Sequence, residues 1–508
     1  MTDAAESAAP TFCPPGKRVF VLVAAILASA MGFIDGSVIS IAVPAIRRNL
    51  GANLGEAQWV QNGYLLFMAS LILIGGAAGD RFGLRRVFAG GIALFVIASL
   101  LCALAPTPLF LIVCRAIQGL GAAFMVPGSL ALIAKAYPRE ERGKAIGVWA
   151  TAASLTTILG PVVGGFLLTA LGPWSWRLVF AINLPLGVGA LALLWLKVPA
   201  DPPADGRRLD WFGGLLVTAA LLLITLGLTP EGSDSTVPGM TQLVGLGGAG
   251  VLLLGGFLLW ESRSAAPMLP LRLFRNRGFS GANALTFALY FALAAISFYQ
   301  PMALIAGWGI SPAEVALSFL PIGICLTVLS SVSGGLADRF GPAPLIAGGA
   351  TLVAAAFAGL ALTAPLQNLW FGVMPLMTLM GIGMGFVVTP LSTAVMTSVS
   401  DGDTGTASGV NNAVSRVAGL LAVAIMGGVA ALVFSRVVAG SGGEALSFGR
   451  PPVSGELAPA AELTRVAATN AAFAAIAWCT AGLAALSACI AWFTLEHRRR
   501  PAGNAGRG

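Results

Sequence analysis

Two side chains of opposite charge interrupt long apolar stretches of this sequence. Asp35 lies in the apolar run 19–46, and Arg115 lies in LIVCRAIQGLGAA (111–123), three positions before Gln118. A carboxylate at the centre of a bilayer costs about 2.5–3.5 kcal/mol, so it is rare without a function. Burial disfavours its charged form, and a neighbouring cation favours it. An acid held between these two effects can bind and release a proton. Arg115 is the obvious tuning partner of Asp35, by direct contact or through water.

Two other interpretations stay open. Asp35 could be a static, hydrogen-bonded anchor, and Arg115, which keeps its charge at physiological pH, could snorkel or bond backbone carbonyls. Against the first, Asp35 is the only one of the 21 acidic residues that we place well inside a span, while Glu314 lies at the mouth of another. Small side chains recur at every fourth position around Asp35, which predicts the close approach of a neighbouring helix. We therefore expect Asp35 to face protein beside this stripe, which consists of Ala28, Gly32, Gly36 and Ser40.

The composition indicates the environment of these residues. Of the 508 residues, 57% are hydrophobic and 10% are charged, against about 25% charged residues in soluble domains. A helix that crosses a bilayer needs about 20 apolar residues and satisfies all its backbone groups internally. The sequence therefore predicts an all-α integral membrane protein with fourteen transmembrane helices. They are expected at about 19–43, 58–78, 87–105, 109–133, 145–170, 177–196, 212–229, 241–260, 280–306, 314–335, 345–364, 369–397, 406–434 and 470–494.

The distribution of basic residues predicts the orientation. Lys and Arg are retained in cytoplasmic loops, and 21 of the 29 fall on the side of the membrane that both termini share, against six on the other side. Both termini are therefore expected in the cytoplasm. The net charge of +8 follows from this topology, so we expect no nucleic-acid partner. Six cysteines, mostly inside apolar spans, and one histidine form no disulfide framework or metal-ligand spacing, so no metal or other cofactor is expected.

An internal repeat divides the chain. GAAGDRFGLRR (76–86) follows the second predicted span and GGLADRFGPAP (334–344) follows the tenth, and both contain G-x-x-x-D-R-F-G. Each copy alone could be a tight turn, with Gly at positive φ and Asp as a helix cap. A duplicated six-helix unit would place the copies six spans apart, so two spans are inserted between the halves. We expect a lead, a first half, a linker with two extra helices, a second half and a basic tail, at 1–18, 19–197, 198–278, 279–495 and 496–508.

The fifth span contains a proline among glycines. LGPVVGGF (159–166) places Pro161 inside a long helix, where it removes an internal hydrogen bond, and its three glycines permit close packing. This combination predicts a bend that suits a rocking motion of one half against the other.

Taken together, these motifs resemble those of the major facilitator superfamily, in particular its fourteen-helix drug:proton antiporters. The similarity extends over FIDGSVISIAVPAI (33–46), the loop motif at 76–86, RAIQGLGAA (115–123), GPVVGG (160–165) and WSWRLVFAINLPLG (174–187). The resemblance implies a major facilitator fold of two six-helix halves plus two inserted helices. It implies Asp35 as the proton-coupling carboxylate and Arg115 with Gln118 as the proton-linked motif.

The same resemblance assigns two further sets of residues. An antiporter motif consists of Gly160, Pro161, Gly164 and Gly165. A cytoplasmic gate consists of Gly76, Asp80, Arg81, Gly83, Arg85 and Arg86, with Asp338 and Arg339 in the second copy. Asp80 is expected to act on a helix N-terminus of the other half, which carries about half a positive charge. The helix that begins near Gly405 and carries Asn411, Asn412 and Arg416 is the expected partner.

We expect a bacterial inner-membrane antiporter that exports hydrophobic, neutral or cationic, drug-like compounds in exchange for protons. A narrow exporter of a metabolite or antibiotic and a proton symporter are the alternatives within transport. A membrane receptor or enzyme is the alternative outside it, but the sequence has no catalytic triad, metal cluster or nucleotide-binding loop.

The expected partners are a small hydrophobic substrate, protons and the bilayer, and the use of a periplasmic adaptor protein is left open. Five residues are candidates to contact the substrate, although aromatic residues at helical spacing more often serve as packing or interface anchors. They are Trp59, Tyr64, Phe298, Tyr299 and Gln300.

Overall fold

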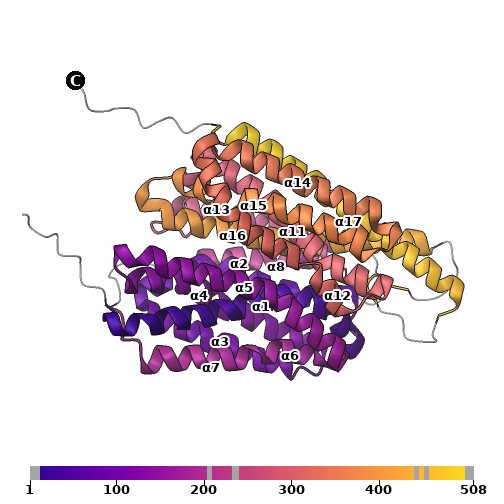
Figure 1. The fold of residues 1–508 in the computed structure, drawn as a ribbon, viewed down its shortest axis with the longest axis horizontal. Coiled ribbons are helices and arrows are strands. Elements are labelled where there is room, and N and C mark those ends of the chain that lie inside the picture. The colour runs from indigo at the N-terminus through magenta and orange to yellow at the C-terminus, as the bar shows by residue number, and fades with distance from the viewer. Residues whose placement is uncertain (1–11, 203–208, 231–238, 440–445, 451–456, 498–508) are drawn as a thin grey trace, which may run out of the picture.

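The computed structural model describes residues 12–202, 209–230, 239–439, 446–450 and 457–497. Long helices, roughly aligned with one another, form two layers, with the first half of the chain in one layer and the last part in the other (Figure 1). Within the described residues, fourteen helical segments are long and apolar enough to cross a membrane. The predicted fold class and number of spans are confirmed. Of the predicted lead and tail, residues 1–11 and 498–508 lie outside the described residues.

The N-terminal layer contains the first six spans. They consist of α1 (Arg18–Leu50), α2 (Leu54–Phe82), α3 (Leu84–Ala103), α4 (Pro108–Ala136), α5 (Arg139–Leu171) and the pair α6 (Trp176–Ala181) and α7 (Asn183–Leu196). The C-terminal layer contains the last six. They consist of α11 (Arg277–Met302), the pair α12 (Pro312–Leu317) and α13 (Leu320–Phe340), α14 (Pro342–Thr363), α15 (Met374–Thr397), α16 (Thr404–Val438) and α17 (Pro459–Thr494). We call the end of the bundle where α1 begins and α17 ends the terminus end, and the other the distal end.

Two spans that were predicted as single helices are interrupted. The sixth breaks between Ala181 and Asn183, and the tenth breaks after Leu317. Proline has no N–H to donate to the carbonyl four residues earlier. Pro185 therefore cannot bond Ala181, and Pro321 cannot bond Leu317, which are the residues at which α6 and α12 end.

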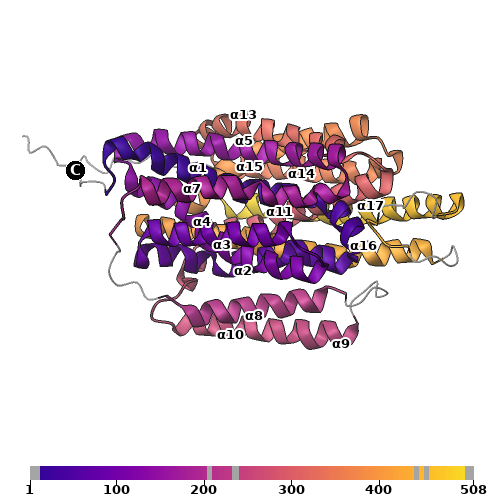
Figure 2. The same cartoon turned by 90° about the horizontal axis from the view of Figure 1, so that it is seen from below.

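The two inserted spans form a pair at the side of the bundle (Figure 2). They are α8 (Trp211–Leu228) and the segment of α9 (Met240–Gln242) and α10 (Gly248–Arg263), and α8 packs on α2. Polar contacts hold their ends at the terminus end. The Asp210 carboxylate accepts a hydrogen bond of 3.0 Å from the indole of Trp260, and Glu261 accepts one of 3.0 Å from the amide of Leu269.

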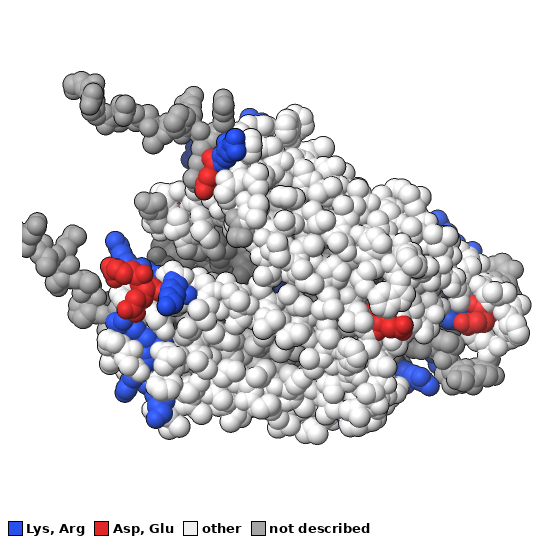
Figure 3. All heavy atoms as spheres, in the orientation of Figure 1, with Lys and Arg blue, Asp and Glu red and all other residues white. Residues whose placement is uncertain are grey.

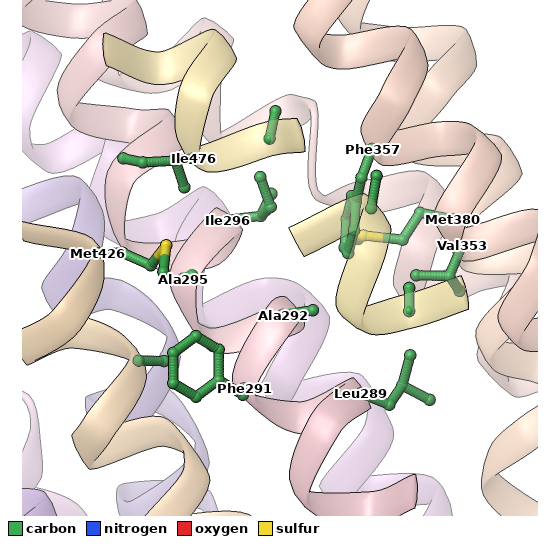
Figure 4. Close-up of a cluster of buried hydrophobic side chains, with 14 of the residues drawn as sticks. Leu289, Phe291, Ala292, Ala295, Ile296, Val353, Phe357, Met380, Met426 and Ile476 are labelled. Atoms are coloured by element: carbon green, nitrogen blue, oxygen red, sulfur yellow. The ribbon is translucent and has the colours of Figure 1, made fainter. Parts of the chain in front are cut away.

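Apolar packing holds each half together. In the C-terminal half, a core of side chains from α11, α14, α15, α16 and α17 includes Leu289, Phe357 and Met380 (Figure 4). Charged side chains gather at the two ends of the bundle, and a surface with almost no charged side chains separates them on the face shown in Figure 3. This arrangement matches a protein that lies across the hydrocarbon of a bilayer.

Glycines bring α2 and α4 into backbone contact. A methyl group added at Gly75 would lie 2.0 Å from the carbonyl oxygen of Ala123, and one at Gly119 would lie 2.2 Å from that of Tyr64. Real side-chain atoms do not approach this closely, so only glycine fits at these two positions. The close approach places the middle of α2 beside the residues of α4 that surround Arg115.

Both copies of the repeated motif form a turn between two helices. Gly83 joins α2 to α3 with φ 95°, and Gly341 joins α13 to α14 with φ 86°. This backbone region favours glycine. At the first copy, the amides of Leu84 and Arg85 each donate a hydrogen bond of 2.9 Å to the carboxylate of Asp201, which lies after α7. The helix cap of α3 is thus Asp201 and not Asp80 of the motif.

Asp201→Asn is expected to reduce the stability of the N-terminal half by about 1–2 kcal/mol at pH 7, since it removes charge from a helix N-terminus. Burial raises the pKa of Asp201, but hydrogen bonds from Lys135 and from the amides of Arg85 and Leu84 outweigh it and lower that pKa. The stabilisation is therefore complete above the unfolded pKa of about 3.9 and is lost as the pH falls through the folded pKa. Thermal unfolding in detergent should show a deficit at pH 7 that shrinks below pH 4. Glu496→Gln is the control, because Glu496 is exposed and follows the C-terminal end of α17. An equal deficit at both pH values would contradict the assignment.

Candidate functional site

Asp35 and Arg115 form an ion pair in the middle of the N-terminal half. Asp35 lies on α1 and Arg115 on α4, and the distance from Arg115 Nη1 to Asp35 Oδ2 is 2.6 Å. Their exposed side-chain fractions are 1% and 0%. The sequence left open whether Arg115 acts on Asp35 by direct contact or through water, and the structure shows direct contact. A charge pair this deeply buried is costly unless its remaining hydrogen bonds are made.

Gln118 completes the ion pair. Its Nε2 donates to Asp35 Oδ1 at 3.0 Å, and its Oε1 accepts from Arg115 Nη1 at 2.7 Å. One turn of α4 therefore presents both Arg115 and Gln118 to the carboxylate, since residues three apart on a helix share a face. The structure thus brings together all three predicted proton-coupling residues.

A second layer of polar groups orients this triad. Gln118 Nε2 also donates to Ser99 Oγ at 2.8 Å, and the side-chain Nδ2 of Asn183 donates to the same hydroxyl at 3.3 Å. Arg115 Nε donates to the carbonyl oxygen of Val60 at 3.0 Å. Sequence reasoning did not single out Ser99 or Asn183. The only available signal is that Asn183 is a polar residue in the sixth span, inside the quoted segment 174–187.

Tyr64 covers the guanidinium. The Cζ atom of Arg115 lies 4.4 Å from the centre of the Tyr64 ring, a distance at which the ring face attracts a cation. Arg115 Nη2 is buried without a hydrogen-bond partner in the described residues. Tyr64, which was predicted as a substrate residue, thus lies between the ion pair and the space described next.

A cavity of about 1430 Å³ lies between the two halves. Its wall includes Tyr64 and Gln61 of α2, and Arg416 of α16. Towards the terminus end, the wall includes Asp80 and the first residues of α16. Asp35 is not part of the wall, although its neighbours Gly32, Phe33, Gly36 and Ser37 are. The cavity therefore reaches the face of α1 next to the ion pair but not the carboxylate itself.

The stripe of small residues on α1 makes room for this cavity. A methyl group at Gly36 would meet nothing within 4 Å, and one at Gly32 would meet only the end of Met125 at 3.6 Å. The prediction of a closely packed helix at these two positions is wrong. The reason is that a small side chain leaves space, and the sequence does not say whether that space is filled by a neighbouring helix or belongs to a cavity.

The antiporter motif packs α5 against α1 of its own half and against α12 of the other half. A methyl group at Gly164 would lie 2.2 Å from Val38 of α1, and one at Gly165 would lie 2.6 Å from Ala316 of α12. Gly160 similarly faces α1, and Pro161 is buried. Because α5 continues through Pro161 from Arg139 to Leu171, the motif acts here as a close-packing surface within a continuous helix.

The predicted gate lies at the terminus end. Gly76 and Asp80 line the cavity, as does Gly405 in the first turn of α16. Arg85 Nε donates to the carbonyl oxygen of Leu194 at 2.9 Å. Gly83 is buried in the turn before α3, and the other four members are exposed; these are Arg81, Arg86, Asp338 and Arg339. Asp80 and the start of α16 therefore border the same opening, while the second copy is not part of the cavity wall.

The other predicted substrate residues lie away from the cavity. Phe298 and Gln300 are buried, and Trp59 packs on the core of the N-terminal half. The hydroxyl of Tyr299 donates to the carbonyl oxygen of Val423 and accepts a hydrogen bond of 2.8 Å from Gln58. This set therefore lies in the packed region, with Tyr299 and Gln58 joining the two halves.

Contacts between the halves close the distal end. Arg47 donates to the carbonyl oxygen of Phe448 at 2.5 Å, and Ala313 N donates to Thr169 Oγ1 at 3.0 Å. Together with the contact of Gln58 and Tyr299, these hydrogen bonds join the halves towards the distal end of the cavity. The geometry is that of a carrier open at its terminus end.

Comparison with known proteins decides the family. Residues 25–423 match the family model described as Major Facilitator Superfamily. The chain belongs to the Major Facilitator Superfamily. An uncharacterised major facilitator transporter of Mycobacterium tuberculosis is 34% identical, over 82% of this chain and 71% of its own length. A probable actinorhodin transporter of Streptomyces coelicolor is 33% identical, over 82% and 73%. A tetracenomycin C resistance and export protein of Streptomyces glaucescens is 31% identical, over 81% and 76%.

Solved structures agree with this assignment at the level of the fold. A bacterial homologue of the human lysosomal transporter Spinster superimposes with a TM-score of 0.69 at 18% identity, covering 96% of this chain and 100% of that one. A D-xylose–proton symporter gives a TM-score of 0.63 at 16% identity, over 95% and 98%. The protein is therefore a multi-pass membrane transporter of the Major Facilitator Superfamily and not an enzyme.

Proposed function

We propose that this transporter exports hydrophobic, drug-like compounds in exchange for protons. The observation that carries the proposal is the position of the triad of Asp35, Arg115 and Gln118, sealed behind Tyr64 at the wall of a cavity that opens at one end. The carboxylate therefore lies next to the cavity but is not part of its wall. Relatives named for drug or antibiotic resistance support export.

The orientation is part of this proposal. The excess of basic residues at the terminus end favours a cytoplasmic location for it in a bacterial inner membrane. The cavity would then be open to the cytoplasm. Substrate that enters it favours loss of the Asp35 proton, and reprotonation from outside resets the carrier.

The driving force is adequate for drug export. Each proton that enters gains about 2.3 kcal/mol per 100 mV of membrane potential and about 1.4 kcal/mol per unit of pH difference. These terms support roughly tenfold to several-hundredfold accumulation per proton.

A narrower exporter is the second candidate, since relatives are named for single compounds such as actinorhodin and tetracenomycin C. Susceptibility to a wide compound panel, on deletion and on overexpression, tests both. A changed response to many unrelated compounds supports multidrug export, and a changed response to one chemical series supports a narrow exporter. Unchanged susceptibility throughout would argue against both.

Reconstituted vesicles test the direction of coupling. Substrate movement opposite to protons is expected, measured with a pH-sensitive dye on one side of the membrane. Movement of substrate and protons in the same direction would indicate a symporter and overturn the proposal.

A further inference from the structure

Arg416 projects a cation into the inner part of the cavity. It lies twelve residues, or about 18 Å, from the start of α16 at Thr404 and lines the cavity wall. Gly419, almost one turn further on, faces Leu65 of α2, which places this part of α16 at the level of Tyr64. Arg416 therefore lies in the cavity wall at the level of Tyr64, which covers the ion pair.

Within the described residues, this cation is not neutralised. Its hydrogen bond is made by Nε, which donates to Asn412 Oδ1 at 3.4 Å, and no carboxylate lies within ion-pair distance of it. Arg115, by contrast, is paired with Asp35. Arginine cannot lose its proton, so Arg416 depends on water or on a bound anion.

The acids of the cavity wall are at its mouth. The three that line it are Asp80 at the end of α2, Asp210 before α8 and Asp403 before α16. Arg272 already binds Asp403 through two hydrogen bonds, of 2.6 and 3.0 Å. Among the described residues, the inner wall therefore carries positive charge without a compensating carboxylate.

The rest of the inner wall fits an amphipathic ring system. Phe33, Tyr64 and Met68 supply apolar and aromatic surface. Gln61 lines the cavity with a buried Oε1 that has no partner in the described residues. This oxygen can accept a hydrogen bond from a hydroxyl or an amide of a ligand.

We propose that the preferred substrates are hydrophobic, ring-containing organic acids whose single carboxylate binds Arg416. The inference rests on the proposed export function and specifies its substrate class. A substrate that fills the cavity displaces the water around Arg416, so a carboxylate replaces that hydration, whereas a cation meets like charge. The planar guanidinium matches a carboxylate with two parallel hydrogen bonds, which favours carboxylates over other anions.

This substrate class changes the electrical work of transport. Export of a monoanion in exchange for one proton moves two charges inward, and export of a neutral compound moves one. At 100 mV, each charge is worth about fiftyfold in accumulation. Accumulation of a carboxylate should therefore respond more steeply to membrane potential than that of its neutral analogue.

Three fluorescent probes with one scaffold test the proposal. Anthracene-9-carboxylate, anthracene-9-carboxamide and 9-(aminomethyl)anthracene carry charges of −1, 0 and +1. Binding to the purified full-length protein is measured by fluorescence titration. We expect the carboxylate to bind at least about tenfold more tightly than the amide, which corresponds to about 1.4 kcal/mol. Arg416→Gln should remove this preference and leave amide binding within twofold, and Arg416→Lys should retain part of it.

Arg436→Gln is the matched control, because Arg436 is on the same helix but exposed and outside the cavity. It should preserve the full preference. A preference for the amide or the amine, a preference unchanged in Arg416→Gln, or no binding of any probe would overturn the proposal. Vesicle assays separate a failure of the export function from a failure of the proposed substrate class. If the protein is not an exporter, no compound will cause proton exchange. If only the amine is exported in exchange for protons, the export function stands and the proposed substrate class is refuted.

Discussion

Asp35→Asn is expected to abolish substrate-dependent proton exchange and to reduce concentrative export by at least about a hundredfold. Asparagine has nearly the same shape as aspartate, but it cannot take up and release a proton. Its single carbonyl oxygen can accept from Arg115 or from Gln118, whereas the carboxylate accepts from both. In vesicles with an imposed pH difference, the variant should bind substrate and equilibrate it without accumulation. Substrate-induced proton release that persists unchanged in the variant would refute the assignment of Asp35.

Loss of folding must be separated from loss of coupling. Removal of one partner of a buried ion pair costs about 3–5 kcal/mol, because the remaining charge is left uncompensated. Asp35→Asn leaves Arg115 in that state. The double variant Asp35→Asn with Arg115→Gln removes both charges, so it should regain stability but not proton exchange. Glu314→Gln is the control for the loss of a carboxylate outside the ion pair. Glu314 caps α12, where its carboxylate accepts a hydrogen bond of 3.1 Å from the backbone amide of Ser311.

The sequence predicted well those features whose alternatives would have a large free-energy cost. Apolar runs of about 20 residues have few alternatives to a membrane-spanning helix, so the fourteen spans could be located. A buried acid and a buried arginine, each expensive alone, need partners, and the observed contact of Asp35 with Arg115 follows this logic. The helix breaks before Pro185 and Pro321 could not be read from proline alone, because α5 continues through Pro161 although that residue also lacks the N–H group.

The features that the sequence did not predict depend on which helix faces which. Ser99 and Asn183 are ordinary polar residues until the fold brings them to Gln118. The glycines at 32 and 36 have the spacing of a packing surface, yet they line a cavity. Tyr299 has the composition of a binding residue but contacts Gln58 across the closed distal end. Each of these contacts depends on which helices the fold brings together.

Gly165→Val is expected to shift the carrier away from the conformation described here. Gly165 of α5 faces the other half at the distal end, where an added methyl group would lie 2.6 Å from both Ala316 Cβ and the carbonyl oxygen of Pro312. The backbone of α12 cannot yield as a flexible side chain would, so the two halves must separate there. Such overpacking typically costs about 1–3 kcal/mol, which changes the ratio of two conformations by about five- to 150-fold.

Accessibility of the distal end measures this shift. In a background without the six native cysteines, Ala313→Cys reports on the closed contact, because Ala313 is only 7% exposed. Gly165→Val should increase its labelling by a membrane-impermeant maleimide at least about fivefold and lower export by about tenfold. Gly147→Val is the matched control on the same helix, since a methyl group there meets nothing within 4 Å. If both valine variants label alike, Gly165 does not hold the halves together. If Ala313→Cys is labelled faster only in the Gly165→Val variant, the small side chains of the antiporter motif allow α5 to contact α12. That contact then keeps the distal end closed while the cavity is open at the other end.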